Sequence, residues 1–209
     1  MAETAGNRPA NAQNSFAGKI RNRQLLAAFA RVERADFLDI SLRPHAASNA
    51  ALPIGHAQTT SQPLVIARML EMMLNRKTPQ NALEIGAGCG YQTALLSLLC
   101  RQVVAVERIG ALARQTAARL RRMGYNNAHV VHADGFSGYP KAAPYDGIVV
   151  CAEHAAVPET LAAQLAPEGR MIMPLCGGNG ARLVAVNAEG KIVARREPVR
   201  FVPLRGGKN

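Results

Sequence analysis

The chain has 209 residues and a net charge of +11 at pH 7, and 48% of its residues are hydrophobic. This length fits one domain with a terminal extension, and the hydrophobic fraction is sufficient for a core. The sequence holds no apolar run of the roughly 18 residues that a membrane-spanning helix needs, and residues 1–15 lack the apolar stretch of a secretory signal.

The N-terminal part of the chain predicts a tail followed by two helices. Residues 1–18, rich in Ala, Asn and Gly, are expected to form a flexible tail. Apolar residues at helical spacing predict a helix over 21–33, and an irregular segment follows as far as His56. Pro63 then begins a second helix over 63–75, because the missing N–H of proline is harmless in the first helical turn.

From residue 81 onward the pattern changes to alternating strands and helices. Strands are predicted over 81–86, 102–107, 128–134, 145–152, 169–175 and 199–204, with a hairpin over 181–197, and helices over 91–100, 110–124 and 157–167. This alternation predicts an α/β fold, a doubly wound and mostly parallel sheet with N-terminal helices and an antiparallel C-terminal edge. We expect one domain over 19–209, with the helices and a polar loop in 19–80 and the sheet in 81–209.

The segment LEIGAGCGYQT joins the first strand of this sheet to the next helix. Gly86, Gly88 and Gly90 form a G-x-G-x-G turn, and Tyr91 stands where a dinucleotide fingerprint requires glycine. The turn therefore suits S-adenosylmethionine, which has no pyrophosphate, better than a nicotinamide dinucleotide. A tight strand-to-helix turn that binds nothing is the alternative interpretation.

Acidic residues in the first three strands of the sheet strengthen the interpretation as a cofactor site. Glu84 lies within the first strand, and Glu107 ends the second, where it is placed to accept hydrogen bonds from ribose hydroxyls. Asp134, at the end of the third strand, is placed to accept from the adenine amine, with Gly135 beside the ring. Each acid alone could instead be a helix cap or a solvated loop residue, but together the three predict one crevice.

Six segments in chain order carry a resemblance to a known family. They are LPIGHAQTTSQP, LEIGAGCGYQTALLS, VVAVERI, RLRRMGYNNAHVVHADGFSGYP, APYDGIVVCA and VRFVPL. Over residues 22–206 the chain resembles the protein-L-isoaspartate O-methyltransferase family, and the T-x-S-Q-P loop and the GYQT after the glycines are its most specific motifs. The resemblance implies a Rossmann-like class I methyltransferase. Such an enzyme transfers a methyl group from S-adenosylmethionine, with S-adenosylhomocysteine as product, to the free carboxylate of L-isoaspartyl residues in damaged proteins, as a step of protein repair.

The resemblance also implies roles for individual residues. It makes Ser61 the catalytic residue, and Thr59, Thr60 and Gln62 join Ser61 in binding the substrate. Arg205, which belongs to this chain and not to the family pattern, is also expected to bind the substrate, because it stands close to where the final strand of the family approaches it. The expected cofactor-binding residues are Glu84, Gly86, Ala87, Gly88, Gly90, Tyr91, Gln92, Thr93, Glu107, Arg108, Asp134 and Gly135.

The uncharged loop around Ser61 suits a carboxylate acceptor. A carboxylate with a pKa of about 4 is already ionised at pH 7, so it needs no general base, and a neighbouring acid would repel it. A hydroxyl can orient it by one hydrogen bond, beside the electropositive start of the following helix. Without the resemblance, Ser61 would be interpreted as an ordinary residue capping that helix.

Two departures from the family pattern leave the acceptor open. HAASNAALPIG lacks the tyrosine and the acid that usually precede the loop, and Glu153 and His154 follow the fourth strand. A divergent enzyme could methylate another carboxylate, in a peptide or in a small molecule. A non-catalytic module that binds S-adenosylmethionine is a second alternative. A nucleic-acid methyltransferase is a third, although 149–158 holds no aromatic residue to stack on a base.

Cysteine spacing and charge distribution guide the remaining expectations. The four cysteines form no C-x-x-C pair, so we expect free thiols, a cytoplasmic location and no metal site. Cys151 ends a buried strand and is interpreted as a core residue, not a nucleophile. The basic clusters at 119–122 and 194–200 are not interleaved with aromatic residues. We therefore expect a solvated basic surface and a monomer. The expected partners are proteins or peptides that carry isoaspartate, and neither nucleic acid nor a membrane is expected to bind.

Overall fold

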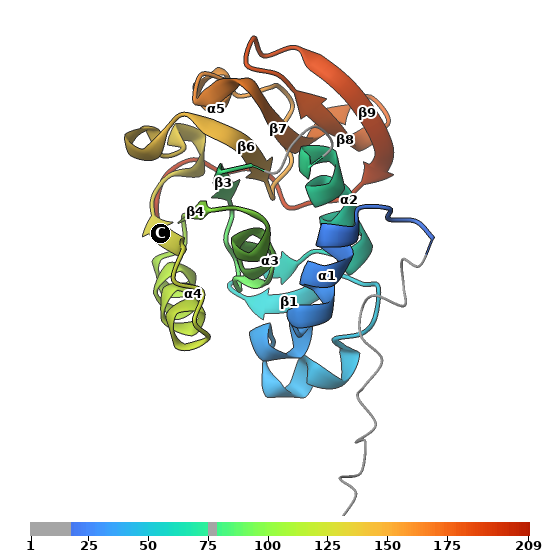
Figure 1. Ribbon diagram of the computed structural model, residues 1–209, viewed down its shortest axis with the longest axis vertical. Helices are drawn as coiled ribbons and strands as arrows, with labels where there is room; N and C mark the ends of the chain where they lie inside the picture. The colour runs from blue at the N-terminus through green and yellow to red at the C-terminus, as the bar shows by residue number, and fades with distance from the viewer. Residues whose placement is uncertain (1–17, 75–78) are drawn as a thin grey trace, which may run out of the picture.

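A seven-stranded sheet lies at the centre of the computed structural model, which describes residues 18–74 and 79–209 (Figure 1). Its strands are β3 (Asn81–Ile85), β4 (Gln102–Glu107), β5 (Ala128–His132), β6 (Tyr145–Val150), β7 (Leu165–Gly177), β8 (Gly180–Val186) and β9 (Ile192–Val199). The strand order is β5-β4-β3-β6-β7-β8-β9. The first five strands pair in parallel, whereas β8 and β9 extend the sheet in antiparallel fashion. The predicted doubly wound fold with an antiparallel C-terminal edge is confirmed.

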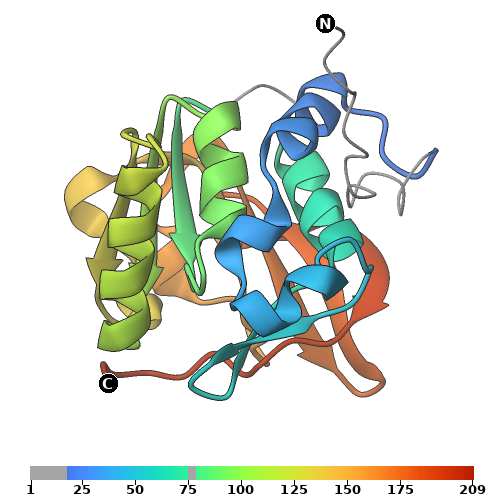
Figure 2. The ribbon, with the colours of Figure 1, turned by 90° about the horizontal axis from the view of Figure 1, so that it is seen from below.

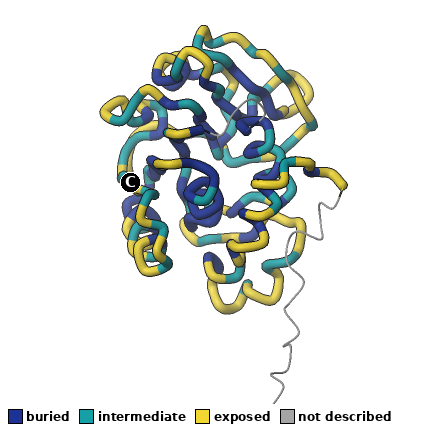
Figure 3. The backbone as a smooth tube through the Cα atoms, viewed as in Figure 1, coloured by how far each residue is buried: buried dark blue, intermediate teal, exposed yellow. Residues whose placement is uncertain are grey.

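Helices cover both faces of the sheet because its central strands are apolar on both sides. The helices are α1 (Arg23–Arg31), α2 (Pro63–Leu74), α3 (Tyr91–Leu99), α4 (Gly110–Arg122) and the single turn α5 (Glu159–Ala162). Ala82 and Val103 pack in one core cluster with residues of α1, α2 and α3. Their neighbours Leu83 and Val104 point to the opposite face and pack in a second cluster with Leu161 of α5. Figure 3 shows α3 buried along nearly its whole length.

Before α2, the chain forms a hairpin where an irregular segment is predicted. β1 (Leu52–Gly55) pairs in antiparallel fashion with β2 (Gln58–Thr60). The two residues between them, His56 and Ala57, have φ values of +52° and +54°. Two positive φ values are the pattern of a type I′ turn, which usually carries Asn-Gly. The sequence lacks that signature, so the hairpin could not be predicted from it.

Two predictions in the C-terminal half are wrong. The helix expected over 157–167 is only one turn long, because β7 already begins at Leu165. Residues 199–204 form no further strand, since β9 ends at Val199. The C-terminal segment, defined here as residues 200–209, instead crosses the carboxyl edge of the parallel strands (Figure 2). It is joined there by backbone hydrogen bonds between Glu153 and both Val202 and Leu204.

Apart from the strand predicted over 169–175, which begins four residues earlier as β7, the other predicted strands and helices agree with the structure to within two residues at each end. The predicted flexible tail lies outside the described residues except for Gly18, and so does Asn75 at the end of the second predicted helix. Within 18–74 and 79–209, no helix combines the length and apolar character that crossing a membrane would require.

Candidate functional site

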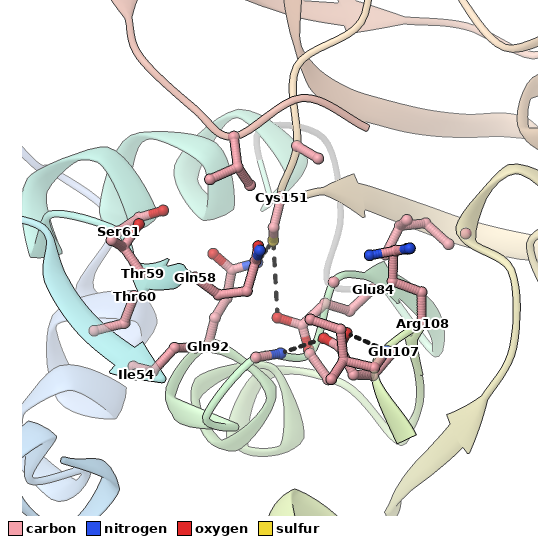
Figure 4. A pocket seen from close by; sticks show the side chains of 18 of the residues that line it. Ile54, Gln58, Thr59, Thr60, Ser61, Glu84, Gln92, Glu107, Arg108 and Cys151 are labelled. Atoms are coloured by element: carbon pink, nitrogen blue, oxygen red, sulfur yellow. Dashed lines mark hydrogen bonds between the residues drawn. The ribbon is translucent and has the colours of Figure 1, made fainter. Parts of the chain in front are cut away.

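A cavity opens at the carboxyl edge of β3, β4 and β6, beneath the C-terminal segment. It contains about 830 Å³ of empty space, part of it open to solvent. Figure 4 shows Ser61 and Thr59 on one side of the cavity and Glu107 and Arg108 on the other, with Gln92 and Cys151 between them. Carboxyl edges of parallel strands are where doubly wound sheets bind their ligands.

The glycine turn forms the floor of this cavity. Gly86, Gly88 and Gly90 have φ values of +92°, +53° and +90°, which favour glycine. The turn is fastened to β4, because the backbone N–H groups of Gly86 and Ala87 donate to the carbonyl of Val106 at 2.8 and 3.2 Å. α3 begins directly after it, and Gly90 offers no side chain to cap the first helical turn. The start of α3 is therefore available to polar groups of a ligand.

Glu107 joins the glycine turn to the end of β4. Its Oε2 accepts a hydrogen bond from the backbone N–H of Gly88, and its Oε1 accepts one from that of Ile109, both at 2.9 Å. The side chain is buried, and it lines the cavity. A carboxylate offers about four acceptor positions. Glu107 therefore keeps the capacity to accept two ribose hydroxyls while it holds the turn.

Glu84 lies deeper in the cavity wall, on the sheet face that α3 covers. It is fully buried, and Thr93 Oγ1 donates to its Oε2 at 2.5 Å. Burial raises the pKa of Glu84 to about 8, although the hydrogen bonds from Thr93 and Gln92 act in the opposite direction. The carboxyl group is therefore mainly protonated at neutral pH in the free protein.

Cys151 directly follows β6, lines the cavity and is half-buried. It packs against the core cluster that contains Ala82 and Val103, which agrees with its interpretation as a core residue. Its sulfur accepts a hydrogen bond from Gln92 Nε2 at 2.9 Å. Burial raises the pKa of the Cys151 thiol well above its usual value, with the neighbouring Glu84 as a smaller cause. The thiol is neutral at pH 7, so it is a packing group and not a nucleophile.

The β1–β2 hairpin and the residues after it form the opposite wall. Thr59, Thr60 and Ser61 line the cavity. A second hollow, outside this wall, shares Thr59, Ser61 and Cys151 with the cavity and continues to Glu153 and Arg200. Ser61 thus stands where the cavity meets an open groove on the protein surface.

Thirteen of the predicted site residues line the cavity: Thr59, Thr60, Ser61, Glu84, Gly86, Ala87, Gly88, Tyr91, Gln92, Glu107, Arg108, Gly135 and Arg205. The other four, Gln62, Gly90, Thr93 and Asp134, are not among its lining residues. A Cβ on Gly90 would lie 2.8 Å from a methyl group of Thr116, so Gly90 serves the packing of α3 on α4. Thr93 stands behind Glu84, and Gln62 lines only the outer hollow.

Asp134 ends the predicted strand and lies two residues after the observed β5 (Ala128–His132), but its carboxylate is used within the fold. Oδ1 accepts the backbone N–H of Phe136 at 2.9 Å, which caps a 3₁₀ turn. Oδ2 accepts the backbone N–H of Gly207 at 2.8 Å and so holds the C-terminal segment. This is the helix-cap alternative that the sequence left open for each acid.

Sequence reasoning missed three groups of residues at this site. Ile54 and Gln58 reach the cavity through the unforeseen hairpin, and Val202, Pro203 and Leu204 reach it through the C-terminal segment. No local signal in the sequence shows that these segments meet the glycine turn. Arg34 was also missed, although its Nη2 donates to the carbonyl of Ser61 at 3.1 Å.

The described residues hold no group of three or more His, Cys, Asp or Glu side chains that could bind a metal ion. The residues of the cavity do fit a nucleoside-containing cofactor. The position of Gly88 requires glycine, since its φ is +53° and a Cβ there would lie 3.0 Å from Ile54 Cδ1. Glu107 supplies the acceptors that ribose hydroxyls need.

Comparisons with known proteins show which family this chain resembles. Residues 12–209 match the model of the protein-L-isoaspartate(D-aspartate) O-methyltransferase (PCMT) family. A protein-L-isoaspartate O-methyltransferase of Chromobacterium violaceum is 43% identical over 192 residues, which cover 90% of this chain and 86% of the relative. One of Aromatoleum aromaticum is 45% identical over 190 residues, which cover 90% and 87%.

Two solved structures share the fold. One, described as a protein-L-isoaspartate O-methyltransferase of Plasmodium falciparum in complex with S-adenosyl-L-homocysteine, has a TM-score of 0.81 at 21% identity, covering 93% of this chain and 96% of that one. Another protein-L-isoaspartate O-methyltransferase has a TM-score of 0.81 at 26% identity, covering 93% and 65%. From the family match and its close relatives, this chain belongs to the protein-L-isoaspartate O-methyltransferase family.

Proposed function

We propose that this protein transfers the methyl group of S-adenosylmethionine to the free carboxylate of L-isoaspartyl residues in damaged proteins. One observation carries the proposal. In a chain of this family, one cavity has the ribose-type acceptor Glu107 on one side and the uncharged hydroxyl residue Ser61 on the other (Figure 4). We also propose that residues 19–209 act as one methyltransferase domain.

The cofactor side of the cavity is formed by the glycine turn and the ends of β3 and β4. When bound, S-adenosylmethionine supplies an electrophilic methyl group on a sulfonium. We assign Glu107 to the ribose hydroxyls, and Gly86 and Gly88 to the close approach of the ligand to the backbone. Gly135 is assigned to the adenine ring, because it lines the cavity. Asp134 is left out, since it does not line the cavity.

On the acceptor side, the residues position an anion and need not activate it. The isoaspartyl carboxylate, with an ordinary pKa of about 4, is already a nucleophile at pH 7. The hydroxyl of Ser61 is assigned to orient one of its oxygens, while the outer hollow beyond Ser61 receives the flanking peptide. Holding the oxygen close to the methyl carbon is the main contribution, and positioning of this kind is worth up to about 7 kcal/mol.

The residues that suggested a different acceptor are engaged within the fold. Glu153 Oε2 accepts the backbone N–H of Phe201 at 3.2 Å. The His154 ring packs edge-on against Phe136, with 5.0 Å between the ring centroids. Both side chains are therefore engaged by neighbouring residues of the fold, and only Glu153 lines the outer hollow, which favours the isoaspartyl acceptor over another acid.

A methyl-transfer assay with labelled S-adenosylmethionine tests the proposal. Three acceptors are compared at equal concentration: an isoaspartyl peptide, the same peptide with normal aspartate, and RNA. The expected result is base-labile label on the isoaspartyl peptide alone, since a methyl ester hydrolyses in base. Label on both peptides would indicate a general carboxyl methyltransferase, and label on RNA alone would refute the proposal. Tight binding of S-adenosylhomocysteine without transfer to any acceptor would favour a non-catalytic module.

A further inference from the structure

Arg34 is a buried arginine in the 3₁₀ helix Arg34–Phe37, and only 2% of it is exposed. Its guanidinium donates hydrogen bonds to four backbone carbonyls. Nη1 donates to Ala46 at 3.4 Å and to Ser48 at 3.1 Å, whereas Nη2 donates to Ala50 at 2.9 Å and to Ser61 at 3.1 Å. One side chain thus ties the segment before the hairpin to the residue after it.

The geometry of these four contacts depends on arginine. A guanidinium is a rigid planar fork with five donors, so its two terminal nitrogens fix the carbonyls that they bind relative to one another. The carbonyls of Ala50 and Ser61 lie on either side of the β1–β2 hairpin and share Nη2. A lysine would keep the charge but could not hold both carbonyl pairs in one plane. Arg34 therefore sets where the backbone of Ser61 stands.

The positive charge of Arg34 lies behind the loop of Thr59, Thr60 and Ser61, called here the acceptor loop. Among the described residues, the ion pairs between carboxylates and arginines involve Arg68 alone, so carbonyl dipoles and no carboxylate compensate Arg34. Burial lowers the pKa of the guanidinium, which still remains charged at neutral pH. A positive charge in a poorly solvated region attracts an anion more strongly than one exposed to water. The loop of Thr59, Thr60 and Ser61 is itself uncharged, and this charge lies directly behind it.

We propose that Arg34 is a positioning residue for the acceptor carboxylate, which fixes the backbone of Ser61 and supplies the positive charge that the acceptor loop lacks. The inference rests on the proposed function. It predicts that the two contributions of Arg34 are separable, because lysine preserves only the charge and glutamine preserves neither the charge nor the full fork.

The test compares Arg34→Lys, Arg34→Gln and the wild type, with the exposed Arg31→Gln as the matched control. Arg34→Lys is expected to lower kcat about tenfold, the loss of roughly one charged hydrogen bond, with KM for the isoaspartyl peptide within about threefold. Arg34→Gln should lower kcat similarly and raise this KM at least about tenfold, since the attraction for the carboxylate is lost as well. The affinity for S-adenosylhomocysteine should stay within about twofold in both variants, because Arg34 contacts no residue of the glycine turn through a hydrogen bond.

Hydrogen exchange of the backbone over 46–62, measured in the presence of S-adenosylhomocysteine, separates this inference from the proposed function. Faster exchange in Arg34→Lys than in the wild type supports positioning even if no acceptor is methylated. Wild-type kinetics or wild-type exchange in both Arg34 variants would overturn the inference, and so would a parallel loss of cofactor affinity. If neither variant folds, Arg34 is a folding residue and the inference is likewise overturned. An inactive wild type contradicts the proposed function alone.

Discussion

The carboxylate of Glu107 accepts the backbone N–H of Gly88 at 2.9 Å, which links the end of β4 to the turn that follows β3. In Glu107→Gln, the amide can accept with one oxygen only, so either Gly88 or Ile109 loses its partner. We expect the affinity for S-adenosylhomocysteine, measured by isothermal titration, to fall about tenfold or more, because hydrogen bonds to charged groups are worth about 1.5–3 kcal/mol. The exposed Glu159→Gln is the control, and unchanged affinity in Glu107→Gln would contradict the ribose assignment.

Ser61→Ala removes the hydroxyl assigned to the acceptor carboxylate. We expect kcat for an isoaspartyl peptide to fall about tenfold, with the affinity for S-adenosylhomocysteine nearly unchanged, because one hydrogen bond to a charged group is lost. Steady-state kinetics and titration measure the two quantities. Ser137→Ala, at an exposed position, is the control. A variant with wild-type turnover would refute the role assigned to the Ser61 hydroxyl.

Ala57→Gly should stabilise the protein. Ala57 has a φ of +54° in the turn between β1 and β2, where a Cβ is unfavourable. Glycine removes that cost, although its freer unfolded chain offsets part of the gain, so we expect an increase in the free energy of unfolding of about 1 kcal/mol. In a domain of this size, that increase raises Tm by about 2–4 °C. Ala51→Gly, at a negative φ, should lower Tm instead, and a lower Tm in Ala57→Gly would refute the strain assigned to this turn.

Glu84 makes stability depend on pH. Its pKa is raised from 4.5 to about 8 in the folded protein, so the folded state holds a proton that the unfolded state releases. This stabilisation is fully present below the unfolded pKa of 4.5 and is lost as the pH rises through the folded pKa of about 8. Between pH 4.5 and pH 8, the contribution of Glu84 to the free energy of unfolding falls by up to about 1.4 kcal/mol per pH unit.

Urea unfolding of the free protein at pH 5.5 and pH 7.5 measures this dependence. We expect the wild type to lose stability at pH 7.5 relative to Glu84→Gln. The difference in unfolding free energy between the two proteins should change by on the order of 2 kcal/mol from pH 5.5 to pH 7.5. The exposed Glu159→Gln should show no such change. Parallel pH profiles for the wild type and Glu84→Gln would mean that another group carries the dependence.

Local patterns in the sequence predicted the centre of the fold. The strands β3, β4 and β6 are short apolar runs, and α3 follows a glycine turn with no competing signal. Glu107 was predicted correctly as a residue of the cavity, since its distance from the glycine turn along the chain fixes its place at the next strand end.

What the sequence could not show depends on contacts between distant segments. Nothing in the chain distinguishes the buried Arg34 from the exposed Arg31, because burial is decided by the loop that folds over it. Asp134 has the expected place after β5, but the N–H of Gly207, which is 73 residues away, takes one of its oxygens. The turn at His56 and Ala57 lacks the usual residues, so local propensity pointed away from a hairpin.

The path of the C-terminal segment has a practical consequence for recombinant work. The N–H of Asn209 donates to the carbonyl of Arg108 at 2.8 Å, and the carbonyl of Asn209 accepts the N–H of Gly110 at 2.7 Å, at the start of α4. Any purification tag fused directly after Asn209 would begin at this pair of contacts, beside Arg108, which lines the cavity. A carboxyl-terminal tag should therefore be cleavable, and cofactor titrations should be repeated after its removal.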